Sequence, residues 1–147
     1  MKITKIEEHV TAVPHIPSIE KSRPGDYLQR PISIIEVHTD EGIIGLGEGG
    51  RGGSLESLGQ IWIGRDPLTV NLTCEGGAMG MALFDIVGKA LGVPANKLMG
   101  SKHWDAVPVG WWSPPLEAGE FAAMAEEGAR LGYKTHKLKA RKRNIVE

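Results

Sequence analysis

The stretch that decides the fold of this chain is ISIIEVHTDEGIIGLGE, residues 32–48. Its first eight residues are rich in β-branched side chains, which favour a strand over 32–39. Asp40-Glu41-Gly42 supplies turn residues, and the apolar run over 43–48 can return beside the first strand. The pattern predicts an antiparallel hairpin, and the alternating residues 2–12 predict a third strand of the same sheet.

Two loops flank the predicted hairpin. Residues 14–31 contain Pro14, Pro17, Pro24 and Pro31 and predict a long loop. The glycine cluster over 45–53 predicts a second loop and fits the pattern G-x-G-x-x-G. Because these glycines end a hairpin strand and do not join a parallel strand to a helix, a tightly packed turn is favoured over a nucleotide site.

Helical patterns follow the sheet. Apolar residues recur at helical spacing over 79–91, and Gly92 with Pro94 just beyond it is a typical stop signal. A short second helix is expected over 94–99. Asp85 lies within the apolar helix, and we interpret it as a hydrogen-bonded structural carboxylate.

The C-terminal third predicts a strand, a helix and a second strand. Residues 107–112 are strand-like, Ser113-Pro114-Pro115 opens a helix that ends at Gly132, and 133–139 form the second strand. Such a crossover favours two parallel strands in one sheet. Trp111 and Trp112 are expected on opposite faces of the first strand, and one helix face is expected to carry Phe121, Met124, Ala125, Gly128 and Leu131.

Lys137 and Lys139 are one residue apart on the last predicted strand, so both ammonium groups leave the same face. Two like charges held together disfavour each other's charged form, and this is how a lysine becomes a base near neutral pH. His136 is expected to point away from them. The competing interpretation is a solvated tail, because six of the 17 Lys and Arg residues lie in the last 14 positions.

The same basic residues are also compatible with a binding protein. A small binding module could use its C-terminal strand to contact an acidic partner or nucleic acid, and its binding would then depend strongly on salt. No aromatic residue after Tyr133 interleaves with these charges, so the sequence does not favour nucleic acid.

Composition sets further bounds. The chain has 147 residues, 41% of them hydrophobic, and a net charge of −1, so it is not a general polyanion binder. The single cysteine, Cys74, excludes an intrachain disulfide and suits a reducing, cytoplasmic compartment. No apolar run approaches the length of a membrane span. The five histidines show no pair with metal-ligand spacing on a helix face, so the sequence assigns no metal ligand to this chain.

Several short sequence motifs occur along the chain in an order that resembles a known family. The chain contains VHTDEGIIGLGE at 37–48, IGRDP at 63–67, ALFDIVGKALGVP at 82–94, VPV at 107–109 and KLK at 137–139. This series closely resembles the N-terminal part of the mandelate racemase/muconate lactonizing enzyme family, in the enolase superfamily. The match runs in order along nearly the whole chain.

The resemblance implies an α+β fold in two parts. Residues 1–103 look like the capping domain, a three-stranded antiparallel sheet followed by helices. Residues 104–147 look like the first β-α-β portion of a truncated (β/α) barrel. The family holds one Mg²⁺ on acidic residues of later strands and removes the α-proton of a carboxylate, as a racemase, an epimerase or an acid-sugar dehydratase.

Residue by residue, the resemblance matches Lys139 to the general base and Lys137 to the group that neutralises the substrate carboxylate and lowers the pKa of its neighbour. Tyr27 in the first loop, and Glu48 and Arg51 in the second, match capping loops that close over substrate. The alternative for these charged loop residues is simple solvation. The implied substrate is a small hydroxy acid or sugar acid.

The chain also departs from the family. A complete barrel needs about 200 residues or more, and the strands that carry the metal ligands are missing here. We therefore expect an incomplete and inactive form that binds no Mg²⁺ alone, which leaves open whether this chain is itself an enzyme. Apolar residues on strands 107–112 and 133–139 lack cover, so the isolated chain is expected to self-associate or to be disordered beyond about residue 104. The basic cluster 141–143 has no counterpart in the resemblance.

Overall fold

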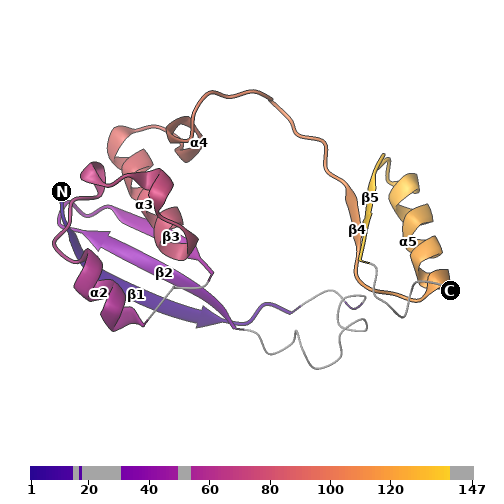
Figure 1. Ribbon diagram of the computed structural model, residues 1–147, viewed down its shortest axis with the longest axis horizontal. Coiled ribbons are helices and arrows are strands. Elements are labelled where there is room, and N and C mark those ends of the chain that lie inside the picture. Colours follow the sequence, from indigo (N-terminus) through magenta and orange to yellow (C-terminus); the bar gives the residue numbers. More distant parts are fainter. Residues whose placement is uncertain (15–16, 18–30, 50–53, 140–147) are drawn as a thin grey trace. The chain divides into compact units, whose positions relative to one another are not determined.

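The computed structural model describes residues 1–14, 17, 31–49 and 54–139. They fall into two compact units (Figure 1), the first built from residues 1–13 and 31–103 and the second including residues 104–139. The first unit contains β1 (Ile3–Thr11), β2 (Ile32–Thr39), β3 (Ile44–Glu48), α2 (Leu55–Trp62), two short 3₁₀ turns (Pro67–Thr69 and Leu72–Cys74), α3 (Gly77–Leu91) and α4 (Ala95–Leu98). The second contains β4 (Trp111–Ser113), α5 (Ala118–Arg130) and β5 (His136–Leu138).

The first unit is built on the predicted three-stranded antiparallel sheet, in the order β1-β2-β3. The β2–β3 turn lies at residues 40–42, where Gly42 has a φ of 77°, a conformation that suits glycine. The Thr39 hydroxyl closes the turn by donating to the Ile43 carbonyl at 2.9 Å. The sheet and its turn therefore confirm the sequence prediction.

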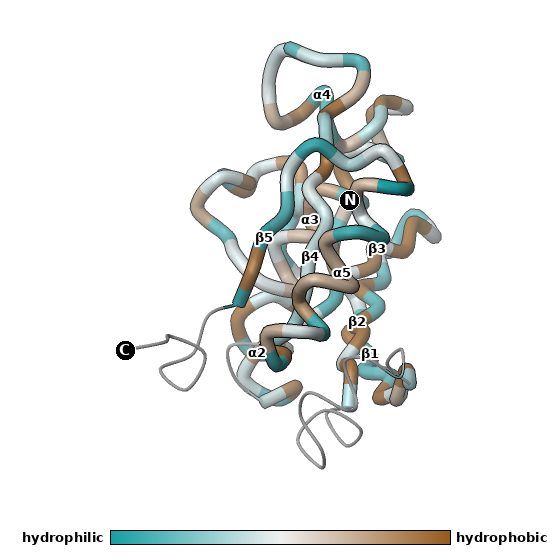
Figure 2. The backbone as a smooth tube through the Cα atoms, turned by 90° about the vertical axis from the view of Figure 1, so that its right-hand side faces the viewer, coloured by the Kyte–Doolittle hydropathy of each residue, from teal (hydrophilic) through white to brown (hydrophobic). Residues whose placement is uncertain are grey.

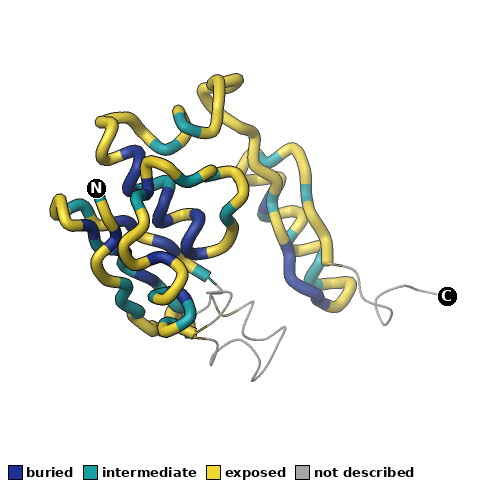
Figure 3. Tube along the Cα trace, turned by 60° about the vertical axis from the view of Figure 1, so that its left-hand side comes forward, coloured by how far each residue is buried: buried dark blue, intermediate teal, exposed yellow. Residues whose placement is uncertain are grey.

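Helix α3 covers one face of this sheet at unusually short range. An ideal Cβ at Gly45 would lie 2.3 Å from the Ala82 carbonyl oxygen, and one at Gly47 would lie 1.8 Å from the Ala78 carbonyl oxygen. Only glycine allows the helix backbone to approach β3 this closely. Buried residues consequently concentrate in the sheet and α3 (Figure 3), among them Ile3, Ile35, Val37, Leu83 and Ile86.

The helix ends follow the expected stop signals. Gly92 follows α3 in the left-handed conformation with φ 66°, and its N–H bonds to the last carbonyls of the helix. The short helix α4 follows at once. None of the helices in the part of the chain that the structure describes is long and apolar enough to cross a membrane.

The second unit confirms the predicted crossover, because β4 and β5 pair in parallel and α5 connects them. Both strands are shorter than predicted. Pro108 has no N–H to donate, and the first bond between the strands runs from the Trp111 N–H to the Thr135 carbonyl at 2.8 Å. Residues 107–110 and 133–135 are therefore not strand.

Helix α5 differs from the prediction at its N-terminal end and in the extent of its apolar face. It begins at Ala118 and not at the prolines, because Glu117 and Glu120 form a capping box there. Leu131 is 49% exposed at the C-cap, so the predicted apolar face ends before it. Gly132 follows with φ 89°, as the stop signal predicts.

Replacement of Gly47 by Ala should destabilise the first unit by about 2 kcal/mol or more, because the added methyl group must push α3 away from β3. Chemical denaturation followed by circular dichroism measures the change. The control is Gly59→Ala in α2, where the new Cβ makes an ordinary 3.5 Å contact with Ile63. That change should stabilise by about 0.5–1 kcal/mol. Equal effects of the two substitutions would contradict the close approach.

Candidate active site

The two lysines singled out by the sequence lie on the second unit. Lys137 is the middle residue of β5, and Lys139 follows the strand directly. Figure 2 shows a hydrophobic residue between hydrophilic ones along β5. Lys137 is registered with Trp112 of β4, so their side chains lie beside each other on one face. Both lysine residues are exposed, and Lys139 would share the face of Lys137 if the strand alternation continued one residue past Leu138.

The opposite face of β5 packs against the helix side. His136 Nε2 lies 2.6 Å from Ser113 Oγ, which joins β5 to β4. This contact confirms that His136 points away from the lysines. A serine beside a histidine can form a nucleophile and its base, but Ser113 has no exposed surface. We therefore interpret the pair as a structural link between the strands.

Trp111 fixes the position of β4 against α5. A Cβ at Gly128 would lie 2.7 Å from the indole ring, so the ring rests on the helix backbone at this glycine. The Tyr133 ring packs against the indole with centroids 5.0 Å apart. Trp112 is 37% exposed on the other face, so the two tryptophans divide between the faces as predicted.

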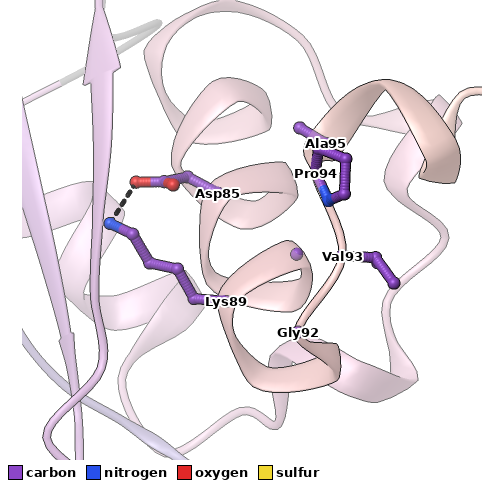
Figure 4. A pocket seen from close by; sticks show the side chains of 7 residues that line it. Asp85, Lys89, Gly92, Val93, Pro94 and Ala95 are labelled. Atoms are coloured by element: carbon purple, nitrogen blue, oxygen red, sulfur yellow. Dashed lines mark hydrogen bonds and ion pairs between the residues drawn. The ribbon is translucent and has the colours of Figure 1, made fainter.

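A polar latch, made by Asp85 and Lys89 of α3, binds the backbone of β3, the strand that ends at Glu48. Asp85 Oδ2 accepts hydrogen bonds from the Leu46 N–H at 2.9 Å and from Lys89 Nζ at 2.7 Å. Lys89 Nζ also donates to the Ile44 carbonyl at 2.6 Å. Figure 4 shows this pair at the pocket beside the end of α3. The predicted structural role of Asp85 is confirmed, and the charges at this pocket already have partners.

The remaining predicted residues are divided. Tyr27, Arg51 and the basic cluster 141–143 lie outside the described residues. Glu48 is exposed and belongs to the first unit, whereas Lys137 and Lys139 belong to the second. The structure therefore describes Lys137 in β5 and Lys139 directly after it, both in the second unit, and it describes Glu48 in the first unit.

The described second unit does not fit a magnesium site. Mg²⁺ requires carboxylate or other oxygen ligands. Three of the five acidic residues within 104–139 are engaged on helix α5, where Glu117 and Glu120 cap the first turn and Glu127 pairs with Arg130. None of the acidic residues within 104–139 directly follows β4 or β5. No catalytic step is therefore assigned to a metal held by these residues.

Sequence reasoning missed a polar cluster in the first unit. Glu7, Glu36 and His38 meet on the sheet, and their ligand atoms all lie within 4.8 Å of one another. Spacing along a helix does not reveal this cluster, because its residues lie on two paired strands. The signal that reveals the cluster is strand alternation, which places Glu36 and His38 on one face of β2 opposite Glu7 of β1.

Comparison with known proteins was made at the level of families, sequences and structures. No family model matches the chain. The N-succinyl-L-Arg/Lys racemase of Bacillus cereus is 31% identical over 95% of this chain and 44% of the racemase. The D-xylonate dehydratase of Haloferax volcanii is 32% identical over 70% of this chain and 32% of the dehydratase. The chain thus spans less than half the length of these curated relatives.

Solved structures show the same relationship. The crystal structure of the Bacillus cereus N-succinyl Arg/Lys racemase covers 97% of this chain with a TM-score of 0.76 and 29% identity, and 45% of the racemase is matched. The dipeptide epimerase of Methylococcus capsulatus, in complex with Mg and the dipeptide L-Arg-D-Lys, covers 95% with a TM-score of 0.70 and 26% identity. The matched part is 46% of the epimerase.

Replacement of Asp85 by Ala should destabilise the first unit by about 1–2 kcal/mol, because it removes a charged acceptor from the Leu46 N–H and from Lys89. The site is partly exposed, which keeps the loss moderate. Denaturation with urea measures it, and amide exchange at Leu46 should accelerate. Asp85→Asn retains an acceptor and should lose less. An unchanged exchange rate at Leu46 in Asp85→Ala would show that the latch does not hold the strand.

Proposed function

Because this chain belongs to the mandelate racemase/muconate lactonizing enzyme family of the enolase superfamily, we propose that it provides the capping region and the lysine-bearing strand of an enzyme that removes the proton next to a carboxylate. The observation that supports this function most directly is the spacing of two lysines, since Lys137 lies in β5, the parallel partner of β4, and Lys139 follows that strand directly. The capping region is residues 1–103, and the barrel portion begins at 104.

The two lysines have different parts in this proposal. Lys139 is the base that accepts the α-proton. Lys137 neutralises the substrate carboxylate. The spacing of the two residues supports this division, because strand alternation would direct both groups toward the same small molecule. The Ser113–His136 contact on the other face holds the strand pair in register.

The capping residues complete the proposal. Tyr27, Glu48 and Arg51 would contact the part of the substrate remote from the reacting carbon, and loops are where such specificity commonly lies. The latch formed by Asp85 and Lys89 supports this for Glu48, since it fixes the strand from which that residue leaves.

The substrate class follows from what the relatives share. N-succinyl-Arg/Lys, the dipeptide L-Arg-D-Lys and the sugar acid D-xylonate all carry a carboxylate next to a carbon that bears hydrogen. We propose a small carboxylate of this kind, processed by racemisation or epimerisation in an isomerase, or by loss of water in a hydro-lyase. A panel of N-acylamino acids, dipeptides, hydroxy acids and sugar acids separates these possibilities.

Magnesium belongs to the proposal only as a property of the family. A bound Mg²⁺ would stabilise the negative charge that develops when the α-proton leaves. The described residues of the second unit do not offer its ligands, so these would come from barrel strands that the relatives have and this sequence does not include. A polypeptide of these 147 residues is therefore proposed to be inactive alone.

The test of the base is a chimera that joins this chain through Lys139 to the remaining barrel of the Bacillus cereus racemase. With Mg²⁺ present, it should incorporate deuterium at the α-carbon of a carboxylate from the panel. Lys139→Ala should reduce this exchange by about 10²- to 10⁴-fold, whereas Lys134→Ala should not. The 147-residue polypeptide should show no exchange. Exchange that survives Lys139→Ala would refute the assignment of the base.

Self-association is the second testable part. Several large apolar side chains of the second unit are exposed, namely Trp104 (75%), Val107 (74%), Val109 (72%), Leu138 (54%) and Trp112 (37%). Exposed apolar patches of this kind seek a partner, and a second copy is proposed to cover them. Light scattering with size exclusion should detect oligomers at micromolar concentration, and Val107→Ser with Val109→Ser should shift them toward monomer. A monodisperse monomer of the unmodified chain would contradict this.

A further inference from the structure

We propose that Glu7, Glu36 and His38 form a binding site for a zinc-type divalent cation on the sheet of the first unit. The three side chains come from two neighbouring strands. Glu7 of β1 lies directly opposite Glu36 of β2, and His38 is two residues further along β2 on the same face. The site is independent of the proposed enzyme function, since it uses none of the residues assigned to it.

The site lies on the sheet face opposite α3. Ile35 and Val37, which alternate with Glu36 and His38 along β2, are fully buried in the core on the α3 side. The three candidate ligands are partly open, with 36%, 32% and 23% of the side chains of Glu7, Glu36 and His38 exposed. An ion can therefore reach the site from solvent.

The distances between the ligand atoms match those around a tetrahedral ion. His38 Nε2 lies 3.0 Å from Glu7 Oε2 and 3.3 Å from Glu36 Oε2. Ligand atoms about 2.1 Å from zinc, at tetrahedral corners, are separated by about 3.4 Å. The three atoms thus surround a point that a zinc ion could occupy with only small movements.

The direction of the imidazole provides a second and independent observation. His38 Nε2 is buried, and among the described residues it has no hydrogen-bond partner, although both carboxylates are near. The oxygens therefore flank the axis along which the ring nitrogen would donate or coordinate. A cation on that axis would have the oxygens of Glu7 and Glu36 on either side of it.

The charges around the site also favour a cation. Like charges directly opposite each other in a sheet are destabilising, and Glu7 and Glu36 are such a pair. Lys5 Nζ lies 2.6 Å from Glu7 Oε1, and this hydrogen bond holds the pKa of the Glu7 carboxyl below its ordinary value. His9 Nε2 lies 3.5 Å from Glu36 Oε1, on the oxygen that faces away from His38. Lys5 is thus a competitor for the ion, and His9 is a positioning residue for Glu36.

The donor set selects the kind of ion. One imidazole nitrogen with two carboxylate oxygens suits zinc and similar transition ions, and three protein ligands leave one coordination position open to solvent. Mg²⁺ prefers six oxygens in an octahedron, which this cluster does not supply. The site is therefore distinct in chemistry from the magnesium site of the family.

The test is calorimetric titration of the untagged whole chain with ZnCl₂ and, separately, with MgCl₂. All proteins carry Cys74→Ser, because the exposed thiol of Cys74 could itself bind zinc. One zinc ion per chain and no magnesium are expected. Glu36→Gln and His38→Gln should weaken zinc binding by about 100-fold or more, and His9→Gln by about tenfold. Glu56→Gln, the same charge change on helix α2, should have no effect.

A variant that binds zinc more tightly gives a further test, because misfolding would weaken zinc binding and not strengthen it. Lys5→Met removes the competing ammonium and should strengthen zinc binding by about two- to fivefold. Co²⁺ in place of zinc should give the visible absorption bands of a tetrahedral site, lost in His38→Gln. Absence of stoichiometric zinc binding, or binding unchanged by both His38→Gln and Glu36→Gln, would overturn the proposal. Either result leaves the deuterium-exchange test of the lysines unaffected.

Discussion

The backbone of helix α3 touches the backbone of strand β3, and the remainder of the first unit depends on this contact. Gly45 and Gly47 lie against the carbonyls of Ala82 and Ala78, where any side chain would collide with main-chain atoms. The small separation lets Leu83 of α3 reach the buried face of the sheet. It also places Asp85 and Lys89 within hydrogen-bonding distance of β3. The close approach of α3 to β3 thus determines both the packing of the core and the hydrogen bonds at the β3 edge of the sheet.

Much of this arrangement could be predicted from the sequence because the relevant signals are local. The β-branched run over 32–39, the turn glycine Gly42 and the stop at Gly92 each act through their own backbone conformation. The strand ends of the second unit could not be predicted in the same way. Val107 and Val109 alternate like a strand, but a strand also needs a hydrogen-bonding neighbour, and pairing begins only at Trp111. The strand propensity of a segment does not show which other segment it pairs with, or where that pairing begins.

The same limit applies to the polar residues. The lysines are neighbours along one strand, so alternation alone predicts their common face. Glu7 and His38 are far apart in sequence, and they meet only because β1 and β2 pair in one particular register. The direction of His136 was predictable from alternation, but its contact with Ser113 depends on the register of the parallel pair. Sites within one element are accessible from sequence, and sites between elements require the pairing.

The side chains of α3 that bond to β3 have a consequence for aggregation. An unpaired sheet edge is a template on which another chain can add a strand, and proteins must protect such edges. Here the Ile44 carbonyl and the Leu46 N–H on the outer edge are occupied by Lys89 and Asp85. At the other edge, Ile3 exchanges backbone bonds with residues 64 and 65. Strand addition is thereby hindered along β3 at Ile44 and Leu46, and at the start of β1 at Ile3.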